Sequence, residues 1–122
     1  MATIVVSTPR TTLLNTLLND FVYISPTGSV VVSSGLAISN LNIADSNVTL
    51  AIDGTVVAAG VFSAISLTGS VGSNEVSIGA TGIVRSMNSD GVALGGSFCE
   101  LLNHGAIYAN DAGVKCSRAR QI

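Results

Sequence analysis

One short pattern recurs four times along the chain: a glycine followed by a run of mostly apolar or β-branched residues. It reads GSVVVS from Gly28, GTVVAA from Gly54, GIVRSM from Gly82 and GAIYAN from Gly105. Successive copies begin 26, 28 and 23 residues apart, and periods of about 20 to 50 residues are typical of solenoid proteins. The pattern predicts stacked repeats within one domain, because 122 residues are too few for two separate cores.

Each copy shows the alternation of a β-strand that has one buried face. The inward columns contain apolar or small residues: Val30, Val56, Val84 and Ile107 in one, and Val32, Ala58, Ser86 and Ala109 in the other. The column between them contains Val31, Val57, Arg85 and Tyr108. Because strand side chains alternate between faces, Arg85 and Tyr108 mark this middle column as outward.

Two further strands per repeat follow the same rule. After the glycine strand, the inward columns are Leu36, Ile65, Val92, Val114 and Ile38, Leu67, Leu94, Cys116, with Ala37, Ser66, Ala93 and Lys115 outward. Before the glycine, they are Val22, Val48, Val76, Cys99 and Ile24, Leu50, Ile78, Leu101, with Tyr23, Thr49, Ser77 and Glu100 outward. We therefore predict an all-β fold, a parallel β-solenoid (three-faced β-helix) of about three to four coils over residues 22–116.

Both ends of the chain depart from the repeat. Residues 9–20 carry Leu13, Leu14, Leu17 and Leu18 behind a proline at position 9, with Ser7 or Thr8 as a helix N-cap. This spacing predicts a short amphipathic helix that caps the solenoid within residues 1–21. Residues 117–122 read as an irregular tail without a third strand, so we expect an open last coil that self-associates or takes a capping partner.

No residue pattern predicts a catalytic, cofactor or metal site. Asp53, Asp90 and Asp111 lie in turns, where aspartate is favoured for local backbone hydrogen bonds, and the single His104 lies at a corner. The outward columns contain one glutamate and no paired carboxylates. Cys99 and Cys116 lack metal-ligand spacing; we expect two buried thiols in different strands, and whether they pair stays open.

Charge and targeting signals narrow the partners further. The formal net charge is −2, and three of the five cations lie in the last eight residues, so no basic face for nucleic acid is expected. No apolar run reaches the roughly 18 to 20 residues of a spanning helix. The N-terminus also lacks the pattern of a cleavable signal peptide.

The stretch GTVVAAGVFSAISLTGSVGSNEVSIGATGIVRSMNSDGVALGGS resembles the degenerate repeats of large bacterial secreted proteins. It is similar to the solenoid regions that precede RTX-type calcium-binding repeats, and to autotransporter or haemagglutinin-like passengers. The resemblance implies a secreted or cell-surface protein, exported by a type I route through an uncleaved C-terminal signal. The calcium-binding nonapeptide itself does not follow Gly95 and Gly96.

These observations lead to one main functional hypothesis and two alternatives. The main one is a non-catalytic structural or adhesive module of a larger bacterial protein, with Val31, Val57, Arg85 and Tyr108 as its contact surface. The same column could instead be covered by a neighbouring domain. The alternatives are a fragment of a β-helix enzyme that acts on glycans and a self-assembling filament module.

Overall fold

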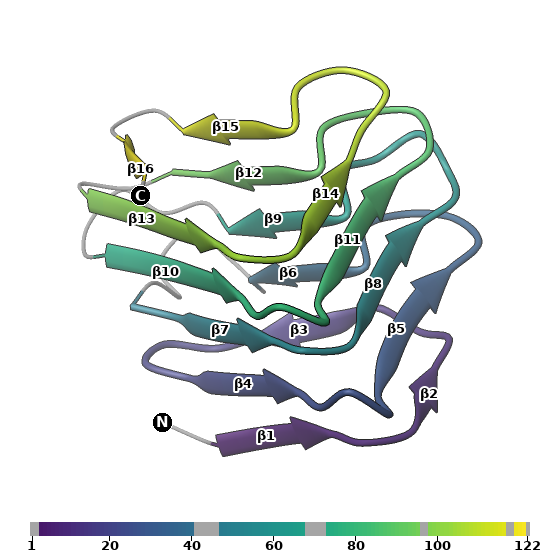
Figure 1. Ribbon diagram of the computed structural model, residues 1–122, viewed down its shortest axis with the longest axis horizontal. Helices are drawn as coiled ribbons and strands as arrows, with labels where there is room; N and C mark the ends of the chain where they lie inside the picture. The colour runs from purple at the N-terminus through teal and green to yellow at the C-terminus, as the bar shows by residue number, and fades with distance from the viewer. Residues whose placement is uncertain (1–2, 41–46, 68–72, 96–97, 117–118, 122) are drawn as a thin grey trace.

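The computed structural model of the protein describes residues 3–40, 47–67, 73–95, 98–116 and 119–121, of which 98–99, 116 and 119–121 are described by their backbone alone. These residues form sixteen short strands and no helix. The strands wind around one core as a parallel β-solenoid with three faces (Figure 1). The predicted all-β solenoid is confirmed.

Each face is one parallel sheet. Sheet A contains β1 (Thr3–Val6), β4 (Phe21–Ile24), β7 (Thr49–Ile52), β10 (Ser73–Ile78), β13 (Phe98–Asn103) and β16 (Ala119–Gln121). Sheet B contains β2 (Pro9–Arg10), β5 (Ser29–Val32), β8 (Thr55–Ala58), β11 (Ile83–Ser86) and β14 (Ala106–Tyr108). Sheet C contains β3 (Leu14–Thr16), β6 (Ile38–Asn40), β9 (Ile65–Leu67), β12 (Val92–Leu94) and β15 (Val114–Cys116). Each successive A, B and C triplet makes one coil, and the predicted range 22–116 corresponds to the four coils from β4 to β15.

The apolar core fills the space between the three sheets. Its members are the inward side chains of every coil, and Val22, Ile24, Val30, Ile38, Leu50, Val56, Ile65, Leu67, Ile78, Val84 and Val92 are among those with no exposed surface. One coil alone leaves these side chains open above and below. Burial therefore requires stacking, at a strand spacing of about 4.8 Å.

The register of sheet B agrees with the sequence alignment. Val30 pairs with Val56 and Val56 with Val84, while Val31, Val57, Arg85 and Tyr108 form one ladder. In the inward column Val30, Val56 and Val84 are buried and Ile107, in the last coil, is half-buried, whereas Arg85 and Tyr108 are exposed. On this face, counting from the recurring glycine therefore predicted correctly both which side chains point inward and which residues pair between coils.

On the other two faces some predicted pairs are displaced by two residues. In sheet C, Ile65 pairs with Ile38, not with Leu36, and Ala37 is buried, although it was expected to face outward. In sheet A, Leu50 pairs with Val22, and Leu101 with Val76. A shift of two residues leaves a strand's side chains on the same face, so the predicted sidedness of sheet A survived the wrong register.

Alternating corner lengths explain the displacement in sheet A. Gly28 lies four positions after Ile24 and Gly82 four after Ile78, whereas Gly54 lies only two positions after Ile52. Each long corner ends in Thr-Gly, and its threonine hydroxyl reaches back to the preceding short corner. Thr27 donates to the carbonyl of Ser7 at 2.9 Å, and Thr81 to that of Asp53 at 2.8 Å. Counting back a fixed number from each glycine therefore misaligns neighbouring coils by two residues.

The recurring glycine is required by the stacking itself. A Cβ at Gly54 would overlap the carbonyl oxygens of Gly28 and Ser25, and one at Gly82 would overlap the carbonyl oxygen of Ile52. Gly28 and Gly105 meet backbone carbonyl oxygens of the preceding coil in the same way. The pattern is repeated because each coil places its corner directly against the backbone of the coil below.

The predicted N-terminal helix is wrong. Residues 3–16 form β1, β2 and β3, which pair with β4, β5 and β6 as one more coil of the solenoid. Leu14 and Thr16 are buried with Asn15 exposed between them, which is the period of a strand, whereas Leu13, Leu17 and Leu18 are 37–49% exposed. The open edge of the next coil gives this segment backbone partners, which outweigh its leucine spacing.

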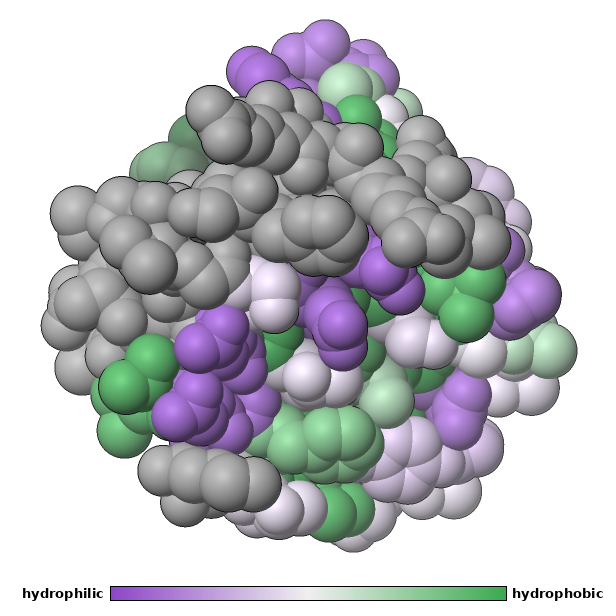
Figure 2. All heavy atoms as spheres, turned by 90° about the vertical axis from the view of Figure 1, so that its left-hand side faces the viewer, coloured by the Kyte–Doolittle hydropathy of each residue, from purple (hydrophilic) through white to green (hydrophobic). Residues whose placement is uncertain are grey.

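The expectation that residues 117–122 contain no third strand is also wrong. Residues Ala119–Gln121 form β16, which pairs with β13 in sheet A. The rest of this segment lies outside the described residues. Figure 2 shows the corner at which sheet C leads into sheet A, where apolar and polar residues are intermingled over the described part of the surface.

Candidate functional site

The predicted contact surface is one continuous ladder on the outside of sheet B. Val31, Val57, Arg85 and Tyr108 come from β5, β8, β11 and β14, in neighbouring strands. Val31 is 40% exposed and Tyr108 55% exposed. The structure thus brings together all four residues of the sequence-based site, with an apolar half and a half that carries a cation and a phenol.

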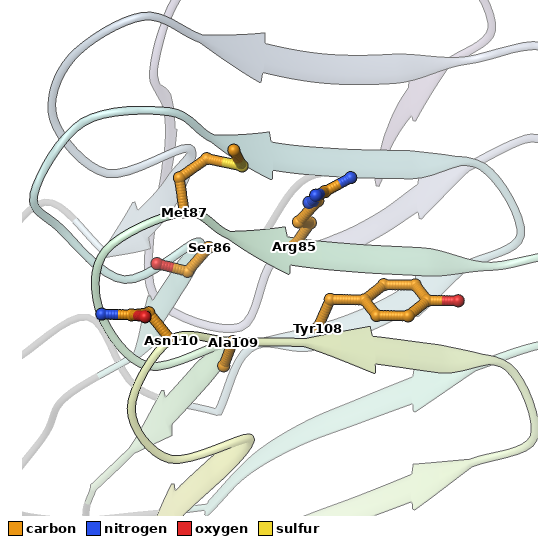
Figure 3. Close-up of a pocket in the computed structure, with 6 residues that line it drawn as sticks. All are labelled: Arg85, Ser86, Met87, Tyr108, Ala109 and Asn110. Carbon is orange, nitrogen blue, oxygen red and sulfur yellow. The ribbon is translucent and has the colours of Figure 1, made fainter.

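A shallow hollow of about 170 Å³ lies at the polar end of this ladder. Arg85, Ser86 and Met87 line it from the end of β11, and Tyr108, Ala109 and Asn110 from the end of β14. Figure 3 shows Arg85 and Tyr108 projecting from neighbouring strands, with Met87 and Asn110 at the other end of the hollow. The Arg85 Cζ atom is 6.0 Å from the centre of the Tyr108 ring, at the outer limit of a cation–π contact.

Hydrogen bonds fix the loops around the hollow. Ser86 is buried, and its hydroxyl donates to the Phe62 carbonyl at 2.9 Å and accepts from the Ser89 amide at 3.1 Å. The Asn110 amide N–H donates to the Ser89 carbonyl at 3.2 Å. The carboxylate of Asp90 accepts from the Ala112 amide at 3.0 Å. The two coils that form the hollow are thereby tied to each other beside it.

Two of the three aspartates expected to form local turn contacts, Asp53 and Asp90, bond across coils instead. Asp90 accepts from Ala112 of the next coil, and Asp53 accepts from the Tyr23 hydroxyl of the preceding coil at 2.9 Å. This hydrogen bond to Asp53, with desolvation and the nearby carboxylate charge adding to it, raises the pKa of Tyr23 above its usual value. Both contacts hold neighbouring coils together at a corner.

Two glutamates form a carboxylate pair that the sequence alignment missed. Glu75 and Glu100 are register partners in β10 and β13, so their Cα atoms lie on adjacent strands about 4.8 Å apart. Glu75 is exposed and Glu100 half-buried on the outer side of sheet A. The alternating corners hid this pair, because counting back from the glycines placed Glu100 opposite Ser77.

The remaining candidates stay isolated. His104 is exposed in a short corner, and within the described residues no three His, Cys, Asp or Glu side chains gather as a metal site would require. Cys99 and Cys116 belong to different sheets, and their side chains, with the question of their pairing, lie outside the description. No described segment forms a helix long and apolar enough to cross a membrane.

One buried amide has a structural task. Asn74 has no exposed surface; its Oδ1 atom accepts from the Val48 amide and its Nδ2 donates to the Gly95 carbonyl, both at 3.2 Å. It thereby links the coils of β7 and β10 and the end of β12. Buried polar groups in folded proteins are normally hydrogen-bonded, as this amide is. We therefore assign Asn74 a structural role in the core rather than a role in a binding site.

Comparison with protein-family models, with curated proteins and with solved structures finds no match to the chain. The geometry therefore defines the class: a parallel β-solenoid repeat protein with an outward ladder on sheet B.

Proposed function

We propose that the chain is a non-catalytic structural or adhesive module of a larger bacterial secreted or cell-surface protein, and that it makes contact through the sheet B ladder. The observation that supports this most directly is the ladder itself. An exposed valine, Val31, a half-buried valine, Val57, and the exposed Arg85 and Tyr108 lie in line over four coils. Exposed apolar and aromatic side chains in a contiguous row are typical of interaction surfaces.

The bacterial, exported setting of this proposal comes from the resemblance to secreted solenoid repeats. A solenoid suits such a role because each coil contacts only its neighbours, so the module works as a stiff spacer that presents one face. Export through a type I route is the form of this proposal that the resemblance favours, and secretion of the tagged native protein into culture medium tests it.

Attachment of protein-coated beads to cultured epithelial cells and to bacterial cells tests the contact surface. Val57→Glu places a charge in the middle of the ladder, and we expect at least about tenfold fewer attached beads, since a buried unpaired charge opposes association. Ser66→Glu is the matched control, because Ser66 lies outward in the same coil on sheet C. Equal attachment of the wild-type protein and Val57→Glu would show that the ladder is not the contact surface.

A second candidate function, a fragment of a glycan-active β-helix enzyme, is favoured by the Glu75–Glu100 pair. Carboxylates on adjacent coils lie at a separation compatible with the roughly 5 to 5.5 Å of retaining glycosidases. Incubation with polygalacturonate and neutral polysaccharides, followed by measurement of reducing ends and of unsaturated products, tests this candidate. Turnover that is lost in both Glu75→Gln and Glu100→Gln would establish it, and turnover that both variants retain would remove the pair from consideration.

A further inference from the structure

We propose that the hollow between β11 and β14 is a binding subsite for a sugar ring that carries a carboxylate, such as a uronic acid residue of an acidic polysaccharide. The proposal names the ligand class for one end of the sheet B ladder, so it rests on the proposed adhesive function. The residues proposed to bind this ligand are Arg85, Tyr108 and Asn110, whose side chains come from two adjacent coils.

The polar groups around the hollow are free for a ligand. Among the described residues, the Arg85 guanidinium forms no ion pair and no hydrogen bond, and the Tyr108 hydroxyl and the Asn110 side-chain amide likewise form none. The guanidinium offers a planar fork of N–H donors that matches a carboxylate in two parallel hydrogen bonds. An amide supplies both a donor and an acceptor, which suits a sugar hydroxyl.

An aromatic surface lies beside these polar groups. Tyr108 is 55% exposed, and its ring adjoins Arg85 along the ladder (Figure 3). One face of a sugar ring consists of C–H groups, which pack against an aromatic side chain, while its edge carries hydroxyls. A ligand that combines an apolar ring face with a carboxylate uses Tyr108 and Arg85 together, whereas a simple anion uses Arg85 alone.

Size and charge exclude other ligand classes. A hollow of about 170 Å³ is smaller than the roughly 300 to 1,000 Å³ of a pocket for a drug-sized molecule, so it accepts a single ring or an end group. Among the described residues that line the hollow Arg85 is the one cation, and Val57 and Val31 continue the ladder without charge. A nucleic acid backbone needs several cations in a row. An apolar peptide would leave the three polar side chains buried without partners.

The hollow is built before any ligand binds. Ser86 is buried with both its donor and its acceptor in use, and the Asn110 backbone is held to Ser89. The β11 and β14 backbones are paired through Arg85 and Tyr108. A fixed site loses little conformational entropy on binding, so a single sugar ring can bind measurably, with a dissociation constant on the order of 1 mM.

Titration of the isotope-labelled full chain, followed by amide and side-chain NMR shifts, tests the proposal. The probes are sodium glucuronate, glucose as the neutral ring, and acetate as the carboxylate without a ring. We expect saturable shifts confined to residues 85–87 and 108–110 with glucuronate, and binding about tenfold weaker with glucose or acetate. Glucose as strong as glucuronate, acetate as strong as glucuronate, or no localised shifts would each overturn the proposal.

Variants separate the roles of the two main side chains. Arg85→Ala should weaken glucuronate binding about tenfold or more and remove its preference over glucose, while Arg85→Lys should recover part of both. Tyr108→Ala should weaken glucuronate binding severalfold, with little effect on acetate. Lys115→Ala is the control, because Lys115 is an exposed cation on sheet C in the coil that also contains Tyr108, next to the coil of Arg85. An equal loss in Lys115→Ala would mean diffuse electrostatics and would overturn the subsite.

The same proteins distinguish failure of the subsite from failure of the proposed function. If glucuronate does not bind but Val57→Glu still abolishes bead attachment, the ladder is a contact surface and the assigned ligand class is wrong. If glucuronate binds at the hollow while bead attachment is unaffected by Val57→Glu, the subsite stands and the adhesive ladder does not.

Discussion

Replacement of Gly54 by alanine should destabilise the solenoid by an amount that its corner geometry determines. The new Cβ would overlap the carbonyl oxygens of Gly28 and Ser25 and would lie 2.9 Å from the Cγ2 atom of Ile24. An ordinary carbon–oxygen contact is about 3.3 Å or longer. The β7–β9 coil must therefore move away from the β4–β6 coil at this corner, because two of the three obstacles are backbone atoms.

That movement weakens the hydrogen bonds that join the two coils. The backbone amides of Asp53 and Gly54 donate to the carbonyl oxygen of Ile24 at 2.8 and 3.1 Å. The backbone amide of Thr55 donates to the carbonyl oxygen of Gly28 at 3.3 Å. Each bond contributes about 0.5 to 1.5 kcal/mol net, and overpacking itself typically costs about 1 to 3 kcal/mol. We expect a loss of about 3 to 5 kcal/mol, which is a large part of the roughly 5 to 15 kcal/mol of a typical domain.

Gly113→Ala is the matched control. A Cβ at Gly113 has one neighbour, the Cγ2 atom of Ile107 at 3.9 Å, and its backbone has no positive φ, so this change should be neutral or stabilising by up to about 1 kcal/mol. In thermal melts followed by circular dichroism, Gly54→Ala should melt about 10 to 20 °C below Gly113→Ala, at roughly 4 °C per kcal/mol. Melting temperatures within a few degrees of each other would refute the explanation of the recurring glycine.

Three further predictions concern single contacts. Asn74→Ala leaves the two backbone groups that its amide bridges without partners, so urea unfolding should show a loss of about 2 to 4 kcal/mol, and a loss under about 1 kcal/mol would contradict that role. Glu75→Lys removes the repulsion with Glu100 and should raise stability by about 0.2 to 1 kcal/mol in low salt, with the gain shrinking as salt is added; a gain that does not depend on salt would have another cause. Because the hydrogen bond to Asp53 raises the pKa of Tyr23 above its unfolded value of about 10, its contribution to stability is complete below pH 10 and is lost as the pH rises through the folded pKa. Melts between pH 8 and 11 should therefore show a steeper alkaline loss for the wild-type protein than for Tyr23→Phe, and parallel profiles would show that the bond does not influence stability.

Sidedness could be predicted from the sequence, whereas register could be predicted only in part. Alternation of apolar and polar residues fixes which side chains enter the core, so Val30, Val56 and Val84 were placed correctly. A slip of two residues preserves that alternation, so the pattern carries no information against pairing Val48 with Val22. The length of each corner decides the register, and the signal for it was the Thr-Gly ending of the long corners.

The features that the sequence did not yield depend on contacts between distant segments. The N-terminal coil has a polar inner residue, Thr16, paired with Asn40, so its core face does not read as apolar. The spacing of its leucines fits a helix. The strand conformation is more stable only because the neighbouring coil offers backbone hydrogen-bond partners. The Glu75–Glu100 pair could not be predicted for a similar reason, because the two residues become neighbours only when β10 and β13 are aligned in the correct register.

The alternation of long and short corners makes the true repeating unit two coils rather than one. From Gly28 to Gly82 the chain advances 54 residues, and only after that distance does a threonine hydroxyl again meet a short corner below it. Deletion or duplication of a single coil would place two corners of the same length against each other and leave one hydroxyl contact unmade. A chain of this design is therefore expected to lengthen or shorten by pairs of coils, and grafting experiments that add one pair should preserve the fold where adding a single coil disturbs it.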